Sequence, residues 1–302
     1  MKGMVQQFIE ALKQDNSGVE AVVLATKDEI LLEHYFTRLV SRNIYSHTKS
    51  YMSTAVGIAI DEGKMKLTDR LADYFPEYLP EEHQPELEEI TLRDLLTMSS
   101  GFNHALLMGD DRRKGTGQPD YLHYMMNLPV EVKPGSLFEY STADSHLAGM
   151  MVAKAVGKKL DVYLYEKMFR PMGMSYPIWE SDPQGYSLGG GGMYMNIVDM
   201  MRIGQLYLAK GQWNGQQIVS EEWIDEATKT QIENRKEENW TAGYGYQFWI
   251  MPQKNIYRAD GAFGQISFIM PDQGYVLAIQ CSEYGDIEKT KKKLIEYIFA
   301  KL

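Results

Sequence analysis

A serine and a lysine one helical turn apart form the most reactive pair of residue types in this sequence. Ser46 and Lys49 stand three residues apart at the start of a segment with helical periodicity, so both lie on one helix face. An amine in this place can reach the hydroxyl and activate it for attack on a carbonyl carbon. Because Ser46 begins the helix, we expect its backbone N–H to be available to a developing oxyanion near the positive end of the helix dipole.

This spacing is not specific by itself. A chain with this composition contains roughly one Ser-x-x-Lys by chance, and a surface lysine after an N-cap serine is the ordinary interpretation. Tyr140 supplies a possible third group, because it follows the Pro134-Gly135 turn and precedes a helix expected from Ser145. A tyrosine on such a loop could face the Ser46 hydroxyl, although with 20 tyrosines in the chain an ordinary loop tyrosine is the simpler reading.

The elements that must position these residues indicate an α+β fold. Aromatic and β-branched runs near both chain ends predict one antiparallel sheet, with strands at 19–26, 30–36, 244–251, 255–259, 265–270 and 275–281. Helical patterns at 3–14 and 287–300 flank it, and the Ser46 helix carries one apolar stripe, Met52, Ala55, Val56, Ala59 and Ile60. Further helices are expected at 90–98, 145–156, 161–169, 197–209 and 221–229. We therefore expect residues 1–63 and 238–302 to form an α/β sheet subdomain and residues 64–237 a mostly helical subdomain, together one catalytic domain.

Composition excludes several classes of function. The 302 residues carry a net charge of −10, and Lys291–Lys293 is the longest basic run, which argues against nucleic acid or a membrane surface as partner. The single Cys281 allows no intrachain disulfide, and its expected role is packing. No clustered His and Cys set predicts a metal, and no motif predicts a cofactor. Residues 1–8 lack the apolar core of a secretory signal, which predicts a cytoplasmic protein, or a secreted or periplasmic one if a leader was removed.

Five segments, in order along the chain, resemble the penicillin-recognising serine hydrolases, a family that includes class C β-lactamases, D-alanyl-D-alanine carboxypeptidases and related esterases and amidases. The resemblance spans about residues 20 to 282. The segments are Ser46–Lys49, similar to the family's Ser-x-x-Lys; Ile90–Gly101, similar to its TIRDLLTHTSG; Pro134-Gly135 through Tyr140-Ser141-Thr142, similar to its Tyr-Ser-Asn element; Gly189–Gly192 with Asp199-Met200; and Gly211–Gly215 through Trp223.

The resemblance implies a β-lactamase/transpeptidase-like fold and assigns roles to residues. It implies that Ser46 is the nucleophile, that Lys49 and Tyr140 transfer protons, and that the N–H groups of Ser46 and Ala262 form an oxyanion hole. Gly261 would let a substrate lie close to the strand backbone. Two departures stand out: Thr142 replaces the family's asparagine, and Ala259-Asp260-Gly261-Ala262 lacks the lysine of the family's Lys-Thr-Gly.

These departures bear on proton transfer and on substrate. If Asp260 faces the site it raises the pKa of Tyr140, so we expect Tyr140 and Lys49 to share one proton as a coupled pair. We expect Arg258 on the opposite strand face, where it could not offset Asp260. The missing lysine disfavours anionic substrates, so neutral esters or amides, or amine-bearing substrates, fit better.

Three hypotheses therefore stay open. The favoured one is a serine hydrolase that forms an acyl-enzyme with small ester or amide substrates, with esterase-type activity. The second is a β-lactamase or D-alanyl-D-alanine carboxypeptidase, and the third is a non-catalytic protein of the same fold that binds a peptide or cell-wall fragment. A Ser-His-Asp triad through Asp144 and His146 is conceivable, but helix-cap and surface roles fit these residues better. The sequence does not indicate an oligomeric state.

Overall fold

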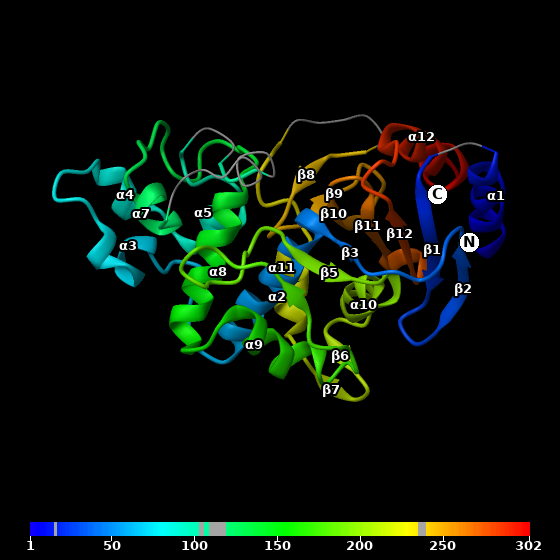
Figure 1. The fold of residues 1–302 in the computed structure, drawn as a ribbon, viewed down its shortest axis with the longest axis horizontal. Helices are drawn as coiled ribbons and strands as arrows, with labels where there is room; N and C mark the ends of the chain where they lie inside the picture. Colours follow the sequence, from blue (N-terminus) through cyan, green and yellow to red (C-terminus); the bar gives the residue numbers. More distant parts are fainter. Residues whose placement is uncertain (15–16, 103–105, 109–118, 235–239) are drawn as a thin grey trace.

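One antiparallel sheet of seven strands organises the molecule, and both chain ends contribute to it, as predicted. The computed structural model describes residues 1–14, 17–102, 106–108, 119–234 and 240–302. The strand order is β2-β1-β12-β11-β10-β9-β8 (Figure 1). The bounds are β1 (Val19–Ala25), β2 (Ile30–Tyr35), β8 (Gly243–Tyr244), β9 (Trp249–Ile250), β10 (Tyr257–Gly261), β11 (Gln265–Met270) and β12 (Tyr275–Cys281).

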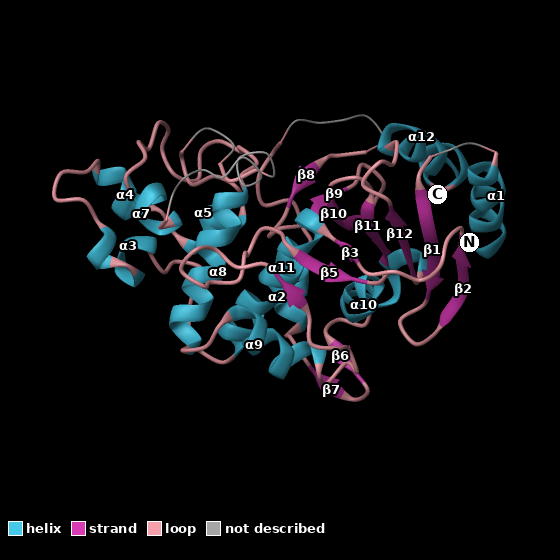
Figure 2. Cartoon of the chain, in the orientation of Figure 1, coloured by secondary structure: helices cyan, strands magenta, loops and turns pink. Residues whose placement is uncertain are grey.

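Helices cover both faces of this sheet, which explains why its central strands read as continuous apolar runs. All seven residues of β1 are buried, and alternate side chains enter two different apolar clusters. Val22 and Leu24 pack with α1 (Lys2–Lys13) and α12 (Ile287–Tyr297), while Val23 packs on the side of α10 (Ile197–Leu208). The terminal helices thus close one face and the helical middle of the chain closes the other (Figure 2).

The middle of the chain is mostly helical and lies beside the sheet (Figure 1). Short strands β3 (Arg42–Asn43), β4 (Ile178–Trp179) and β5 (Met193–Met195) form a three-stranded sheet, and β6 (Gln212–Trp213) pairs with β7 (Gln216–Gln217). The helices are α2 (Thr48–Asp61), α3 (Leu71–Tyr74), α4 (Pro85–Glu89), α5 (Leu92–Leu96), α7 (Tyr121–Met126), α8 (Thr142–Val156), α9 (Leu160–Leu164) and α11 (Glu221–Ala227). The division into subdomains at residues 63 and 238 stays a prediction.

Helix α2 differs from its predicted amphipathic form. Every residue from Thr48 to Ala59 is buried, because α2 packs against α8, α9 and strand β10 at once. A helix enclosed on all sides needs no polar face, and its few polar side chains must find partners inside the protein. The expected strand at 244–251 is also different: it is a hairpin of β8 and β9. Among the described residues, no helix is long and apolar enough to cross a membrane.

Candidate active site

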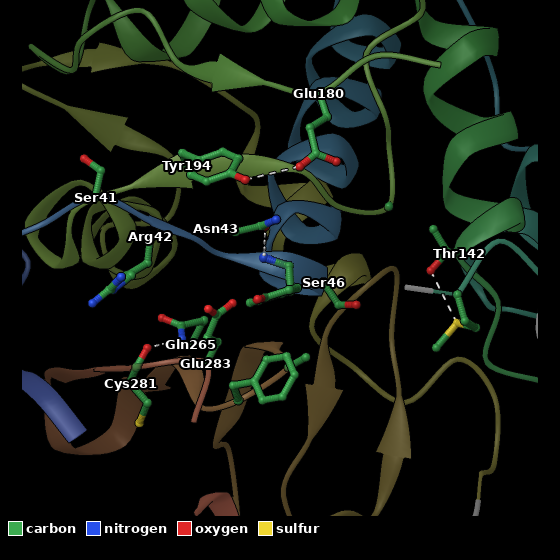
Figure 3. A pocket seen from close by; sticks show the side chains of 15 residues that line it. Ser41, Arg42, Asn43, Ser46, Thr142, Glu180, Tyr194, Gln265, Cys281 and Glu283 are labelled. Carbon is green, nitrogen blue, oxygen red and sulfur yellow. Dashed lines mark hydrogen bonds between the residues drawn. The ribbon is translucent and has the colours of Figure 1, made fainter. Parts of the chain in front are cut away.

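Ser46 lies on a tight turn that joins β3 to the central helix α2. Residues Tyr45–His47 form a single 3₁₀ turn, and Tyr45 has a left-handed backbone with φ of 47°. This conformation is costly for a residue with a side chain. A hydrogen bond from the Tyr45 N–H to Asn43 Oδ1 (2.8 Å) and an edge-on contact between the Tyr45 and Phe263 rings hold it. The turn places Ser46, half-buried, on the wall of a cleft of about 670 Å³ (Figure 3).

Lys49 lies one turn behind Ser46, as predicted, and is almost completely buried. Its Nζ lies 3.4 Å from Ser46 Oγ, 3.3 Å from Thr142 Oγ1 and 2.7 Å from the Gly190 carbonyl oxygen. Its exposed fraction is 1%. A side chain at Gly190 would obstruct this arrangement, because a Cβ there would lie 3.0 Å from Lys49 Nζ. The surface-lysine interpretation is therefore wrong, and the amine points at the serine.

Tyr140 reaches the same place from a distant loop. Its phenol interacts with the Ser46 side chain, and Lys49 Nζ lies 5.2 Å from its ring centroid. The ring stacks on Trp249 at 5.3 Å, which fixes its orientation. Burial raises the pKa of the phenol; the interaction with Ser46 and the charge of Arg258 act against this rise, and the charge of Asp260 adds to it. Tyr140 is therefore a neutral phenol at pH 7.

The two backbone amides of the predicted oxyanion hole belong to Ser46 and Ala262, two residues that line the cleft. Among the described residues, no group accepts a hydrogen bond from the N–H of Ser46 or of Ala262, and both residues line the cleft. Gly261 lies where the protein's own backbone comes very close, and its predicted role toward a substrate stays a prediction. A Cβ at this position would lie 2.1 Å from the Ile44 carbonyl oxygen, so the glycine allows β10 to pack on the turn that carries Ser46. This close packing holds Ala262, the residue after β10, near the turn that carries Ser46.

Thr142 faces the cleft, which the sequence left undecided. It begins helix α8 and lines the cleft beside Ser46 (Figure 3). Its hydroxyl is within hydrogen-bonding distance of Lys49 Nζ at 3.3 Å and of Met108 Sδ at 3.4 Å. A threonine thus contacts the lysine from the place where the family's asparagine is expected.

Asp260 is paired with Arg258, and the prediction that these residues lie on opposite faces is wrong. Residues two apart in a strand share a face, and Arg258 Nε donates to Asp260 Oδ2 at 2.8 Å. The guanidinium is 2% exposed, donates to the Trp240 carbonyl at 2.6 Å, and lies between the rings of Trp240 and Trp249. Asp260 is not among the described residues that line the cleft, and the guanidinium of Arg258 compensates its charge.

Asp144 and His146 do not form a catalytic triad with Ser46. His146 Nε2 lies 3.1 Å from Asp182 Oδ2, and Asp144 accepts a hydrogen bond from the Ser100 hydroxyl at 2.9 Å. Both side chains are buried in α8, away from the cleft wall. His47 contacts Ser267 Oγ at 2.9 Å, and burial lowers its pKa to about 3, which keeps it neutral. These residues support the structure.

Cys281 lines the outer part of the cleft but is 1% exposed. Burial raises the pKa of its thiol to about 12, which leaves it protonated and unreactive at neutral pH. Among the described residues no group of three or more His, Cys, Asp or Glu side chains is arranged to hold a metal ion.

Sequence reasoning missed three parts of the site. The Gly190 carbonyl oxygen receives Lys49, Trp249 supports Tyr140, and Gln265 lines the cleft opposite Thr142. The four-glycine run Gly189–Gly192 was a visible signal for close backbone approach. Nothing local marks Trp249 or Gln265, because their roles depend on how distant strands pack.

Comparison with known proteins matches this arrangement to one family. The family model described as Beta-lactamase matches residues 5–296. A relative from Escherichia coli (strain K12), named "Putative D-alanyl-D-alanine carboxypeptidase", is 30% identical over 153 residues, which cover 48% of this chain and 35% of that protein. The chain spans less than half the length of the curated relatives it matches: 35% of the Escherichia coli protein and 48% of a Bacillus subtilis (strain 168) relative named "Putative penicillin-binding protein PbpX".

Two solved structures illustrate the shared fold. The octameric penicillin-binding protein homologue from Pyrococcus abyssi superposes with a TM-score of 0.74 at 20% identity, over 99% of this chain and 77% of that one. EstCE1, described as a hydrolase with promiscuous acyltransferase activity, gives 0.74 at 16% identity over 98% of both chains. The likeness to these structures extends over almost the whole chain and the family model matches 292 of its residues, 5 to 296; this protein belongs to the Beta-lactamase family.

Proposed function

We propose that this protein is a serine hydrolase that forms an acyl-enzyme with small ester or amide substrates, with esterase-type activity. The observation that carries the proposal is the convergence of Lys49 and Tyr140 on the Ser46 hydroxyl at the wall of the cleft. Membership of the Beta-lactamase family supports a hydrolase. A protein that only binds its ligand has no need for all three groups at one place.

The first step transfers the acyl group to Ser46. Its Oγ attacks the carbonyl carbon, the proton of the hydroxyl passes to the Tyr140–Lys49 pair, and the oxyanion accepts hydrogen bonds from the N–H groups of Ser46 and Ala262. One such donor is typically worth about 3–4 kcal/mol at the barrier. The pair then returns the proton to the leaving group, and water releases the acyl group by the same route in reverse.

The proton acceptor is the pair and not a permanent tyrosinate. Lowering the pKa of a tyrosine from about 10 to about 7 requires roughly 4 kcal/mol, and burial acts in the opposite direction at Tyr140. Lys49 Nζ faces three acceptor oxygens and lies 5.2 Å from the centroid of the Tyr140 ring, so the two groups are close enough to share a proton. Loss of one proton from this coupled pair creates the base, whichever atom it leaves.

The cleft supports neutral or amine-bearing substrates over anionic ones. The lysine of the family's third element is absent, and the nearby Arg258 is buried and held by Asp260. A β-lactamase or D-alanyl-D-alanine carboxypeptidase must hold a substrate carboxylate; Arg42 also lines the cleft, but Glu20 already accepts two of its hydrogen bonds. A carboxypeptidase remains the second candidate because the Escherichia coli relative is named as a putative D-alanyl-D-alanine carboxypeptidase.

A fluorophosphonate probe tests the nucleophile directly. We expect one covalent adduct, located on Ser46 by peptide mass spectrometry and lost in Ser46→Ala. Parallel assays with a short-chain p-nitrophenyl ester and with nitrocefin test the substrate class. Equal or greater kcat/KM for nitrocefin would overturn the esterase assignment, and a folded protein that gives no adduct would favour the non-catalytic alternative.

A further inference from the structure

The outer end of the cleft lies on the other side of Ser46 from Thr142 and takes no part in the proposed chemistry. Arg42, Gln265, Cys281 and Glu283 line this end, and Glu180 lines the opposite wall beside Tyr194 (Figure 3). We call these residues the outer subsite. They come from β3, β11, the end of β12 and the segment after β4, so the tertiary fold alone assembles them.

Gln265 offers a hydrogen-bond acceptor that no described residue uses. The side chain is 1% exposed, and its Oε1 is buried without a partner. Its Nε2 donates to the Cys281 carbonyl oxygen at 2.6 Å. Because a carbonyl can only accept, this bond fixes which end of the amide faces Cys281 and turns Oε1 the other way. An unpaired buried acceptor destabilises the fold, and a donor on a ligand would remove this cost.

Among the described residues that line the outer end of the cleft, carboxylates outnumber cationic side chains. Arg42 is the one cationic side chain among the described residues that line the cleft, and its Nε and Nη2 both donate to the buried Glu20. Glu283 and Glu180, both exposed, add negative charge to the two walls. Among the described residues that line it, the outer subsite thus has two exposed carboxylates, Glu180 and Glu283, beside the Gln265 acceptor oxygen, and its one cation, Arg42, is already held by Glu20.

We propose that the outer subsite binds a primary ammonium group of the substrate. The ammonium donates a hydrogen bond to Gln265 Oε1, and the Glu283 carboxylate balances its charge, with Glu180 across the cleft. A divalent metal fits less well, because Ca²⁺ takes six to eight oxygen ligands and Mg²⁺ six. This inference rests on the proposed function for its biological use, since it defines which ester or amide substrates the cleft prefers.

Binding to the Ser46→Ala protein tests the inference without any turnover. The probes are heptanamide, 7-aminoheptanamide and its trimethylammonium analogue, measured by isothermal titration calorimetry at pH 7.5. We expect 7-aminoheptanamide to bind about tenfold more tightly than heptanamide, because a charge-assisted hydrogen bond outweighs an exposed ion pair. We expect the trimethylammonium analogue, which has no N–H donor, to lose at least about threefold of this preference.

Added substitutions in the Ser46→Ala background assign the effect to the outer subsite. Glu283→Gln should reduce the preference for the amine by about fivefold. Glu81→Gln, which removes the same charge from an exposed residue that does not line the cleft, should leave it unchanged. Equal affinity for heptanamide and 7-aminoheptanamide, or an unaltered preference in Glu283→Gln, would overturn the proposal. A trimethylammonium analogue that binds as tightly as the amine would contradict the proposed hydrogen bond to Gln265 Oε1.

Turnover by the unsubstituted enzyme separates this inference from the proposed function. Hydrolysis of p-nitrophenyl heptanoate and of its 7-amino derivative should depend on Ser46. The kcat/KM for the 7-amino ester should be higher in the unsubstituted enzyme than in Glu283→Gln. A preference for the amine in binding, with no hydrolysis of either ester, would contradict the hydrolase assignment and still support the ammonium subsite.

Discussion

Two clusters of polar side chains meet at helix α8, and only one of them is equipped for chemistry. The first, the reaction cluster, consists of Ser46, Lys49, Tyr140 and Thr142. The second, the support cluster, consists of Asp144, Ser145 and His146, one turn further along the same helix. Both contain a serine beside a proton-transferring residue type, so residue types alone do not distinguish them.

The two clusters differ in solvent exposure and in whether their polar groups all have partners. Each member of the support cluster is at most 1% exposed and has a partner: Ser145 donates to Gln247 Oε1 at 2.7 Å, Asp144 accepts from Ser100, and His146 contacts Asp182. In the reaction cluster Ser46 remains half-buried on the wall of a cleft, next to backbone amides that no described group uses. A buried, satisfied network stabilises a fold, whereas a nucleophile needs one open side.

The largest expected effect is an opposite response of two serines. Ser46→Ala should lower kcat/KM for a p-nitrophenyl ester by at least about 10³-fold, with stability changed by less than about 0.5 kcal/mol. Ser145→Ala should lower the free energy of unfolding by about 1–2 kcal/mol, because Gln247 Oε1 loses its donor, while activity of the folded protein stays within about threefold. Ester hydrolysis and urea unfolding of both variants check this. Equal loss of activity in the two would erase the distinction between the clusters.

Removing one oxygen from Tyr140 comes next. Tyr140→Phe should lower kcat/KM by about 10²-fold, the usual scale of a proton-transfer group, while the stacking on Trp249 preserves stability. The fully exposed Tyr284→Phe serves as a matched control. Ester hydrolysis between pH 6 and 10 is the measurement, and we expect the rise of activity with pH to be lost in the variant. A decrease of less than threefold would take Tyr140 out of the reaction cluster.

The support cluster should reveal itself through the pH dependence of stability. Burial raises the pKa of Asp144 from 3.8 to about 7, so the folded state binds an extra proton between these values and wild-type stability falls as pH rises from about 4 to 7. Asp144→Asn removes this pH-dependent loss of stability. The unfolding free energy of the variant, relative to that of the wild type, should therefore rise by roughly 1–3 kcal/mol between pH 4 and pH 7.

Urea unfolding at several pH values measures the effect of Asp144→Asn, with the exposed Asp73→Asn as control. A difference between variant and wild type that does not change with pH would show that Asp144 is ionised throughout. In that case the support cluster holds a charge, and the comparison with the reaction cluster would need a different basis.

The smallest effect concerns the coupling between Asp260 and Tyr140. The charge of Asp260 raises the pKa of the phenol, so Asp260→Asn should move the rise of kcat/KM with pH to lower pH, by up to about one unit. Asp28→Asn, an exposed substitution in the turn between β1 and β2, controls for net charge. A shift to higher pH, or no shift, would show that Arg258 already cancels the effect of the Asp260 charge on the Tyr140 phenol.

Much of the scaffold could be predicted from the sequence, and so could the local half of the site. The strands at both chain ends and the helix after Ser46 appear close to their expected bounds, because apolar periodicity reports which residues face a core. The burial of α2 on all sides and the β8–β9 hairpin were missed. Both depend on neighbours far along the chain, which local periodicity does not register.

What the sequence determined by itself is the contact between Ser46 and Lys49, since three residues of helix fix both side chains on one face. The tertiary structure decided everything that must converge on this pair. Tyr140, Thr142 and the Gly190 carbonyl lie 91 to 141 positions after Lys49 in the sequence. Backbone geometry sets contacts within a turn, whereas contacts across the chain exist only after helices and strands have packed, and packing is a property of the whole molecule.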